Sequence, residues 1–252
     1  MKLGVKKTVF GAIVLTLFLP ALPIPAQRLT PEVRDQTYLI GILAKEGVER
    51  CRARWEATGL YLSDRIDGVA FTIKPLAFEE VLPAVAGKKI DFLLANPLYY
   101  VRAATAHGAE RIATLKNLRD DVVSSRFGGV IFCRSDRNDI STIDDLKGKR
   151  FAAADPQSFG GWLTVLRLLR AEGIKPDEDF QKLLFAGTHD LAVEAVLEGR
   201  GDAGSVRTGT LEHLQVEGRL DSGVFKIIHP VTDSGDFPFS HSTRLYPEWP
   251  FA

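Results

Sequence analysis

Short apolar runs alternate with amphipathic segments along the chain from residue 38 onward. Each run has the length of a buried strand, and each following segment repeats its apolar residues at the spacing of a helix. In the first such helix, Val48, Cys51, Trp55 and Leu62 share one face. Strands are predicted over 38–43, 70–73, 92–95 and 112–115, and helices over 48–64, 78–86 and 98–106. This order predicts an α/β fold with a mainly parallel sheet covered by helices on both faces.

A polar stretch over 116–127 interrupts this rhythm, which then starts again. Strands are predicted over 129–133, 151–154, 183–186, 202–206 and 224–228, and helices over 141–146, 162–171, 190–198 and 210–217. A Ser or Thr side chain is expected to cap the 141–146 helix, and Gly148 to end it. The tail after Pro230 is rich in Pro, Ser and Asp and is expected to be irregular.

Two consecutive α/β series predict two lobes with a hinged ligand cleft between them. We place lobe 1 at residues 27–127, lobe 2 at 128–230 and a segment that returns to lobe 1 at 231–252. Residues 1–26 have the pattern of a secretory signal peptide, with a basic start, an apolar core over 9–19 and a proline-rich exit ending at Ala26. The alternative is an uncleaved membrane anchor, but the apolar core is shorter than the ~20 residues of a spanning helix.

Composition narrows the function classes. The chain has 32 basic and 32 acidic residues, and this balance argues against a nucleic-acid partner. Its two cysteines, Cys51 and Cys133, fall in a predicted helix and a predicted strand of different lobes, so we expect two free thiols. No set of residues has metal-ligand spacing or forms a recognisable catalytic triad, so we predict no metal, no cofactor and no catalytic residue.

Small or hydroxylated residues follow four of the predicted strands, at the points where helices begin. Free backbone N–H groups and the helix dipole favour an anion at such junctions, and ligands of open α/β sheets lie beyond the carboxyl ends of the strands. We therefore predict a small-oxyanion site. The candidate ligand-binding residues are Tyr99, Tyr100, Ser158, Phe159, Gly160, Thr188, His189, Arg207 and Thr208.

Each candidate also has a structural explanation. Ser and Thr at helix starts are ordinary caps, and Gly160 with Gly161 would allow a helix to pack closely on the sheet. Arg207 is equally well explained as a surface cation. Tyr99 and Tyr100 point to different sides of a helix, so only one can reach the cleft. A contact between His189 and the anion predicts affinity that falls as the pH rises, because only the protonated ring attracts an anion.

Several segments resemble the phosphonate/phosphate-binding proteins of ABC importers, which are type II periplasmic binding proteins. The matching segments are 92–97, 155–162, 187–190 and 202–204. Three further segments, 111–116, 127–132 and 241–250, resemble more narrowly the periplasmic sensing halves of tetrathionate-type sensor histidine kinases. The resemblance implies a location in the periplasm, a small oxyanion ligand, and a membrane sensor histidine kinase or an ABC permease as partner.

The resemblance also implies roles for individual residues. A tyrosine, a Ser-Thr pair and a histidine contact the anion in phosphonate binders, and the matching positions here are Tyr99 or Tyr100, Ser158 with Phe159, and His189. Phe159 replaces the threonine, and the lost hydroxyl argues against phosphonate itself. In the sensor family a further helix, a membrane span and a kinase follow. The chain stops at Ala252, so we expect either a shortened relative that acts through a separate membrane partner or a truncated product.

Three functions are therefore compared. The first is a periplasmic binding protein that reports a small oxyanion to a membrane sensor kinase, and the second is the binding component of a phosphate/phosphonate-type ABC importer. The third, a hydrolase or transferase acting on phosphate-like groups, needs a positioned nucleophile, base or metal, and the sequence shows none. We expect a binding protein and not an enzyme.

Overall fold

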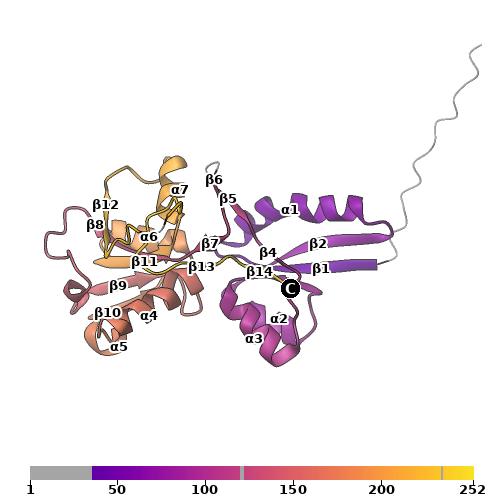
Figure 1. Ribbon diagram of the computed structural model, residues 1–252, viewed down its shortest axis with the longest axis horizontal. Coiled ribbons are helices and arrows are strands. Elements are labelled where there is room, and N and C mark those ends of the chain that lie inside the picture. Colours follow the sequence, from indigo (N-terminus) through magenta and orange to yellow (C-terminus); the bar gives the residue numbers. More distant parts are fainter. Residues whose placement is uncertain (1–35, 120–121, 234) are drawn as a thin grey trace, which may run out of the picture. The chain divides into compact units, whose positions relative to one another are not determined.

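The computed structural model describes residues 36–119, 122–233 and 235–252, and these residues belong to one compact unit. The predicted signal peptide at 1–26 lies outside the described residues. The described chain folds into two five-stranded sheets, each with its own helices, and two small two-stranded sheets (Figure 1). The α/β fold with mainly parallel strands is confirmed.

The first sheet has the strand order β2-β1-β3-β14-β4. Its strands are β1 (Gln36–Leu43), β2 (Val69–Leu76), β3 (Phe92–Leu94), β4 (Ala113–Thr114) and β14 (Pro250–Phe251). The first three run parallel, and β14 lies antiparallel between β3 and β4. Helix α1 (Val48–Arg65) lies on one face of this sheet, while α2 (Val81–Ala86), which a 3₁₀ turn precedes, and α3 (Pro97–His107) lie on the other (Figure 1).

The second sheet has the order β10-β9-β11-β8-β12. Its strands are β8 (Gly129–Arg134), β9 (Arg150–Ala153), β10 (Lys182–Phe185), β11 (Ala203–Arg207) and β12 (Phe225–Ile228). Strands β10, β9 and β11 are parallel, and β8 is antiparallel to both of its neighbours. The helices are α4 (Thr164–Ala171), α5 (Pro176–Asp179), α6 (His189–Leu197) and α7 (Thr210–Val216).

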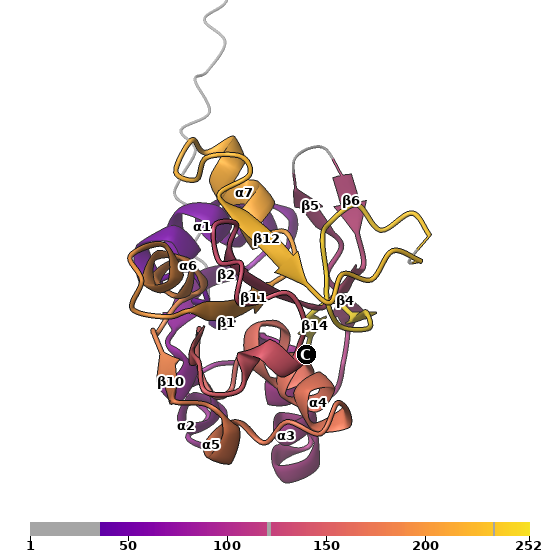
Figure 2. The same ribbon diagram turned by 90° about the vertical axis from the view of Figure 1, so that its left-hand side faces the viewer.

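Both faces of the second sheet are buried, which explains its continuous apolar strands. Along β8, Ile131 and Cys133 face a core that includes α4, whereas Val130 and Phe132 face a core built with α6 and α7. Figure 2 shows α4 and α5 on one side of this sheet and α6 and α7 on the other. A third core surrounds the first sheet and also contains Trp249 from the tail.

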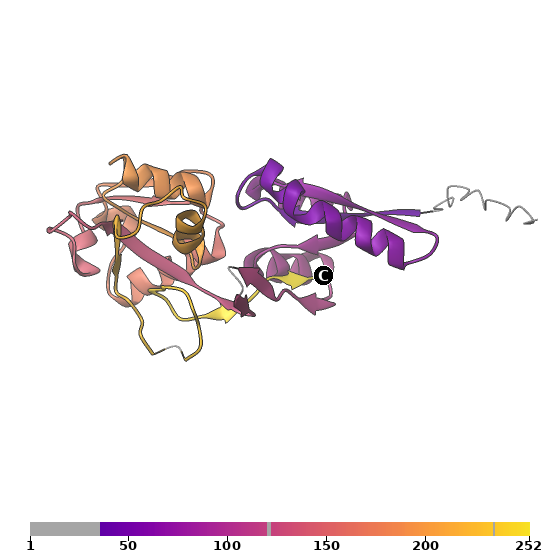
Figure 3. The same ribbon diagram turned by 90° about the horizontal axis from the view of Figure 1, so that it is seen from above.

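Two short strands lie at the points where the chain passes between the sheets. Strand β7 (Arg126–Phe127) comes before β8 of the second sheet, and β13 (Tyr246–Pro247) comes before β14 of the first. They pair antiparallel, with Phe127 opposite Tyr246. Figure 3 shows the C-terminal segment, in yellow, entering the first sheet. The lobe boundaries set at 127/128 and 230/231 remain a prediction.

The structure corrects several local predictions. The polar stretch 116–127 contains a hairpin, β5 (Asn117–Arg119) with β6 (Val122–Ser124), and the tail contains β13 and β14. These strands are too short for an alternation pattern, and β13 and β14 also depend on partners distant in sequence. The predicted 112–115 strand is limited to β4, and α5 was not predicted. The 162–171 helix begins earlier, as a π-helical turn over Phe159–Leu163.

The predicted cap at 141–146 is wrong. Only a 3₁₀ turn, Asp144–Leu146, forms there, and no Ser or Thr side chain caps it. Instead the Asp145 carboxylate accepts hydrogen bonds from Ser141 N, Thr142 N and the Thr142 hydroxyl at 2.8–2.9 Å. These bonds, chiefly the one from Ser141 N, lower the pKa of Asp145.

The cysteine prediction is confirmed, since Cys51 and Cys133 are both free and buried. Burial is the main cause that raises the pKa of the Cys51 thiol to about 11, and it also raises the pKa of Cys133. Both side chains therefore stay protonated at neutral pH and behave as small hydrophobic groups.

Candidate functional site

The junction after β9 is a buried turn. Ser158 is 2% exposed, and its hydroxyl accepts a hydrogen bond of 3.3 Å from Gly161 N. Its carbonyl accepts from Trp162 N at 2.9 Å and from Leu163 N at 3.0 Å, which sets the π-helical turn. Ser158 is therefore an N-cap in this structure, as the structural explanation of this residue predicts.

His189, the first residue of α6, lies next to this turn. It is 3% exposed, and its Nδ1 accepts a hydrogen bond of 3.2 Å from Arg207 N. A Cβ atom on Gly161 would lie 2.6 Å from His189 Cε1, so only glycine fits there. The fold thus brings Ser158, His189 and Arg207 together at the ends of β9 and β11. A ring nitrogen that accepts a hydrogen bond carries no proton, so Nδ1 cannot donate to an anion.

Four other candidates make contacts within the protein. A Cβ on Gly160 would lie 3.0 Å from both Gly128 O and the Phe127 ring, so this glycine permits close packing. Thr188 caps α6 through a bond from Leu191 N. Thr208 N donates to Gly128 O at 3.0 Å, and the Thr208 hydroxyl accepts from Gly128 N at 3.2 Å. The Phe159 ring packs on Phe127 and Tyr246, with centroids 5.9 and 5.1 Å away.

The two tyrosines differ as the helix geometry requires. Tyr99 is fully buried, its hydroxyl donates to Phe78 O at 2.6 Å, and burial raises its pKa. It packs the core and has no geometric support as a ligand group, while Tyr100 is half-buried. Asn96 caps α3 through Leu98 N and also donates to Gln157 O at 3.2 Å. Its side chain thereby connects the end of β3 with the turn after β9.

Arg207 is a predicted site residue that lines a cavity with charged walls. It is the last residue of β11 and only 5% exposed. Its guanidinium pairs with the Glu248 carboxylate, which is 2% exposed, and stacks over the Phe127 ring with Cζ 4.7 Å from the centroid. Its Nε is buried and has no hydrogen-bond partner in the described part of the chain. The sequence alternative of a surface cation is therefore wrong for Arg207.

Trp249 supplies a second N–H group of the same kind. The residue is 6% exposed and packs in the core of the first sheet, where its carbonyl accepts from Leu115 N at 2.9 Å. Its indole Nε1 is buried and lacks a partner among the described residues. Sequence reasoning missed Trp249 and Glu248 as site residues, because both lie in the tail that was expected to be irregular. The only signal was the match of 241–250 to the sensor family.

Arg207 and Trp249 line the same cavity. Its other charged lining residues are Lys45, Glu46, Arg50, Arg54 and Glu248, so four cationic side chains face two carboxylates. Leu43, Cys51, Trp55 and Leu115 contribute apolar walls. The cavity volume is ≈ 30 Å³, whereas one water needs roughly 10–15 Å³, so the space suits a group the size of two or three waters.

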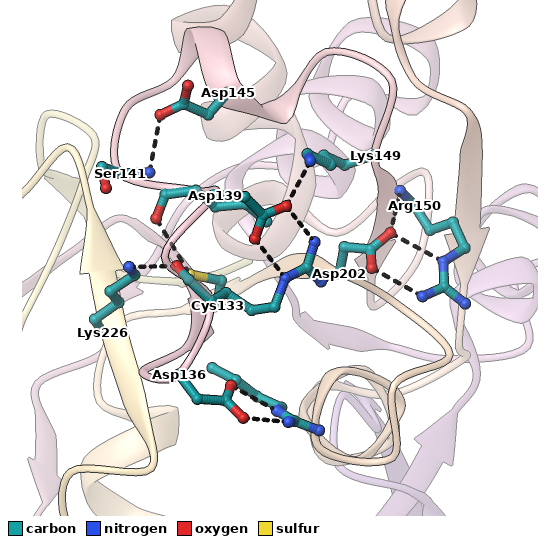
Figure 4. Close-up of polar contacts among 12 residues, drawn as sticks. Cys133, Asp136, Asp139, Ser141, Asp145, Lys149, Arg150, Asp202 and Lys226 are labelled. Carbon is teal, nitrogen blue, oxygen red and sulfur yellow. Dashed lines mark hydrogen bonds and ion pairs between the residues drawn. The ribbon is translucent and has the colours of Figure 1, made fainter.

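A second polar cluster lies at the opposite ends of the same strands, where ligands of α/β sheets do not usually bind. Asp202, just before β11, accepts hydrogen bonds from Arg150 and Arg137 at 2.6–2.9 Å, and Asp139 accepts from Arg137 and Lys149 (Figure 4). The bond from Arg150 contributes most to holding the pKa of Asp202 well below its usual range. This cluster ties the loop after β8 to the starts of β9 and β11.

The described residues contain no group of three or more His, Cys, Asp or Glu placed to hold a metal ion. No helix within the described ranges is long and apolar enough to cross a membrane.

The family of periplasmic substrate-binding proteins of phosphonate ABC transporters matches residues 40–252. The chain belongs to this family. Its members and structural neighbours are binding proteins, and the family is periplasmic. The tetrathionate sensor histidine kinase TtrS of Salmonella typhimurium is 33% identical over 217 residues, which cover 86% of this chain and 36% of that protein. The chain therefore spans little more than a third of this curated relative.

A second relative and two solved structures agree with the fold. The phosphate-import protein PhnD of Mycolicibacterium smegmatis is 21% identical over 88% of this chain and 71% of its own length. The binding protein of an ABC phosphonate transporter from Pseudomonas aeruginosa superposes with a TM-score of 0.67 at 17% identity, covering 86% of this chain and 68% of that one. PhnD1 of Prochlorococcus marinus, in complex with methylphosphonate, gives 0.62 at 18% identity over 85% and 75%. The chain has the type II periplasmic binding protein fold.

Proposed function

We propose that this protein is a periplasmic binding protein that holds a small oxyanion against Arg207 and Trp249. The observation that carries the proposal is a pair of buried N–H groups, Arg207 Nε and Trp249 Nε1. Neither has a partner among the residues that the structure describes, and both side chains line one cavity. A buried donor without an acceptor costs roughly 1–3 kcal/mol, and an oxyanion oxygen would supply the acceptor. The excess of cationic side chains in the lining favours a negative charge.

The two donors belong to different parts of the fold, which is what a two-lobe binding protein requires. Arg207 ends a strand of the second sheet, and Trp249 packs in the core of the first. An oxyanion that accepts from both would stabilise the arrangement that brings them together, because other arrangements present only one donor. The candidates Ser158, His189 and Tyr100 remain proposals for the edge of this site.

We further propose that the bound state is reported to a membrane sensor histidine kinase. The support is the 33% identity to a tetrathionate sensor kinase, and it makes a sulfur oxyanion the first ligand to test. Delivery to an ABC permease is the alternative, supported by the lower identity to a phosphate-import protein. Both partners lie at the membrane, in keeping with a periplasmic location.

Thermal unfolding and calorimetry test the binding proposal. The purified chain is screened against tetrathionate, thiosulfate, sulfate, phosphate, methylphosphonate and arsenite. A true ligand at about 100 times its Kd should stabilise the fold by about 2.7 kcal/mol. If none of these anions raises the Tm or gives a binding heat, the proposal is wrong.

Replacing Trp249 with Phe tests the site itself, because the change removes the indole N–H and keeps an aromatic ring. Trp249→Phe should weaken the binding of the anion by about 0.5–1.5 kcal/mol, or roughly 2- to 12-fold in Kd. Trp162→Phe is the matched control, since Trp162 is buried in the core of the second sheet and is not part of the cavity lining. Equal Kd values for the two variants would remove Trp249 from the site.

A deletion strain distinguishes sensing from import. Sensing predicts that anion-dependent gene induction is lost while uptake of the labelled anion is unchanged. Loss of uptake with normal induction would establish the importer alternative.

A further inference from the structure

Arg207 is held on two sides by the segments through which the chain passes between its sheets. Its guanidinium stacks on Phe127 of β7, and it pairs with Glu248, the residue after β13. These strands pair with each other, Phe127 opposite Tyr246, and Glu248 N donates to Ser125 O at 2.8 Å. Any rotation of one sheet against the other must be absorbed by these residues, so they have the position of a hinge. We call the two paired strands β7 and β13, together with Glu248 directly after β13, the hinge pair.

Glu248 is a buried negative charge within the proposed anion site. One carboxylate oxygen contacts the Arg207 guanidinium, and the other accepts from Trp249 N at 3.3 Å. The residue is 2% exposed and lines the cavity with Arg207 and Trp249. A ligand anion at Arg207 would therefore approach a carboxylate that already uses the same guanidinium.

We propose that Glu248 is an internal anion that competes with the ligand for Arg207, so that ligand binding weakens the Arg207–Glu248 pair and moves the hinge pair. This inference rests on the proposed function and adds a route by which occupancy becomes a change of conformation. Two negative groups near one buried guanidinium repel each other, because a low dielectric screens them poorly. The ligand stays bound to Arg207, and the repulsion displaces the segment that carries Glu248.

The same arrangement sets a preference for ligand charge. Each additional negative charge on the ligand gains attraction from Arg207 and incurs repulsion from Glu248, while its desolvation cost keeps rising. The site should therefore prefer a singly charged oxyanion group to a doubly charged phosphate.

Glu248→Gln tests the inference, because the amide keeps an oxygen for the guanidinium and removes the charge. The binding of two probes, tetrathionate and inorganic phosphate, is measured by calorimetry. Glu248→Gln should bind the probe that the wild type binds at least about tenfold more tightly than the wild type does, since one buried repulsion is removed. Glu46→Gln is the matched control, because Glu46 lines the same cavity but pairs with Lys45 and Arg54. It removes the same charge from the lining without touching the hinge pair.

Amide hydrogen exchange supplies a second readout, which begins with the wild type. In the wild type, the bound probe should change exchange in 122–128 and 244–249, and this response should disappear in Glu248→Gln and persist in Glu46→Gln. If the wild type binds a probe but exchange in these segments stays the same, the inference is wrong. It is also wrong if Glu248→Gln binds no more tightly than Glu46→Gln. If the wild type binds neither probe, the two measurements are made with whichever anion of the binding screen it does bind, and a wild type that binds none of them overturns the inference together with the proposed function.

Discussion

At the scale of single residues, part-buried or buried charges are paired at both ends of the second sheet. At one end, Asp202 accepts four hydrogen bonds from arginine side chains and the Arg150 backbone. At the other, Arg207 retains a donor, Nε, without a partner in the described ranges. A satisfied buried cluster stabilises a fold, whereas an unsatisfied buried donor marks a place for a ligand. The contrast supports a stabilising role for the Asp202 group and the binding role proposed for Arg207.

Asp202→Asn should lower the free energy of unfolding by about 1.5–3 kcal/mol at pH 7, because the change weakens charge-assisted hydrogen bonds to a part-buried carboxylate. Hydrogen bonds, first from Arg150, hold the pKa of Asp202 well below its usual range. Its contribution is therefore fully present above the unfolded value of ~3.9 and is lost as the pH falls towards the lowered folded value. Urea unfolding should show that the stability of the variant depends less on pH below about pH 4 than that of the wild type.

Asp136→Asn is the control, because this exposed carboxylate pairs with Arg134, which is also exposed. Figure 4 shows this pair apart from the Asp202 cluster. Its effect on stability should stay within about 0.5 kcal/mol. Equal losses in the two variants would contradict the structural role given to Asp202.

At the scale of elements, the tail connects the strands of the second sheet before it enters the first. Ser242 is 1% exposed. Its hydroxyl accepts from Ile131 N of β8 at 2.9 Å and donates to Ile228 O of β12 at 2.7 Å. Thr243 similarly accepts from Gly129 N at 2.9 Å. The side chains of this segment thus supply hydrogen-bond partners to backbone groups of β8 and β12 that would otherwise have none from this segment.

Ser242→Ala should reduce the free energy of unfolding by about 1–3 kcal/mol, because the Ile131 N–H group is then buried without its acceptor. Chemical denaturation measures this loss. Ser135→Ala serves as the comparison, since the Ser135 hydroxyl makes a single solvent-exposed bond, to Gly223 O. We expect that variant to lie within about 0.5 kcal/mol of the wild type. A smaller loss for Ser242→Ala than for Ser135→Ala would show that water replaces the Ser242 hydroxyl.

At the scale of the whole molecule, polar contacts join helices of the two sheets around the cavity. Arg50 of α1 pairs with Asp190 of α6 at 2.7 Å and with Glu217, after α7, at 3.8 Å. Arg102 of α3 donates to the Gln157 side chain at 3.0 Å. Such contacts favour the arrangement that places Arg207 and Trp249 at one cavity, so they should influence affinity.

Arg50→Gln should weaken oxyanion binding more than Arg54→Gln does. Both arginines lie on α1 and line the cavity, but Arg54 pairs with Glu46 on the same side, at 3.7 Å. The difference should be that of one exposed ion pair, about 0.2–1 kcal/mol, or roughly 1.4- to 5-fold in Kd. It should shrink as salt is added, because salt screens exposed charges. Calorimetry at two ionic strengths measures both effects, and identical affinities would exclude the role given to Arg50.

The amino-acid sequence by itself determined the α/β class and most of the longer elements. Helices such as α1 and strands such as β8 follow from apolar periodicity, because each buries a whole face or a continuous run of residues. The strand-to-helix junctions were also found, and the fold brings Ser158, His189 and Arg207 together as the carboxyl ends of neighbouring strands require. The pattern along the chain is sufficient to predict those elements whose residues are close together in the sequence.

Only the tertiary structure decided which of these residues remain available for a ligand. Thr188 caps a helix and Tyr99 packs in the core, and hydrogen bonds that form only on folding decide this. Glu248 and Trp249 reach the cavity because β13 and β14 pair with strands more than a hundred residues earlier, from β3 to β7. Strands of two residues have no periodicity of their own, so their place, and the site they complete, depends on distant partners.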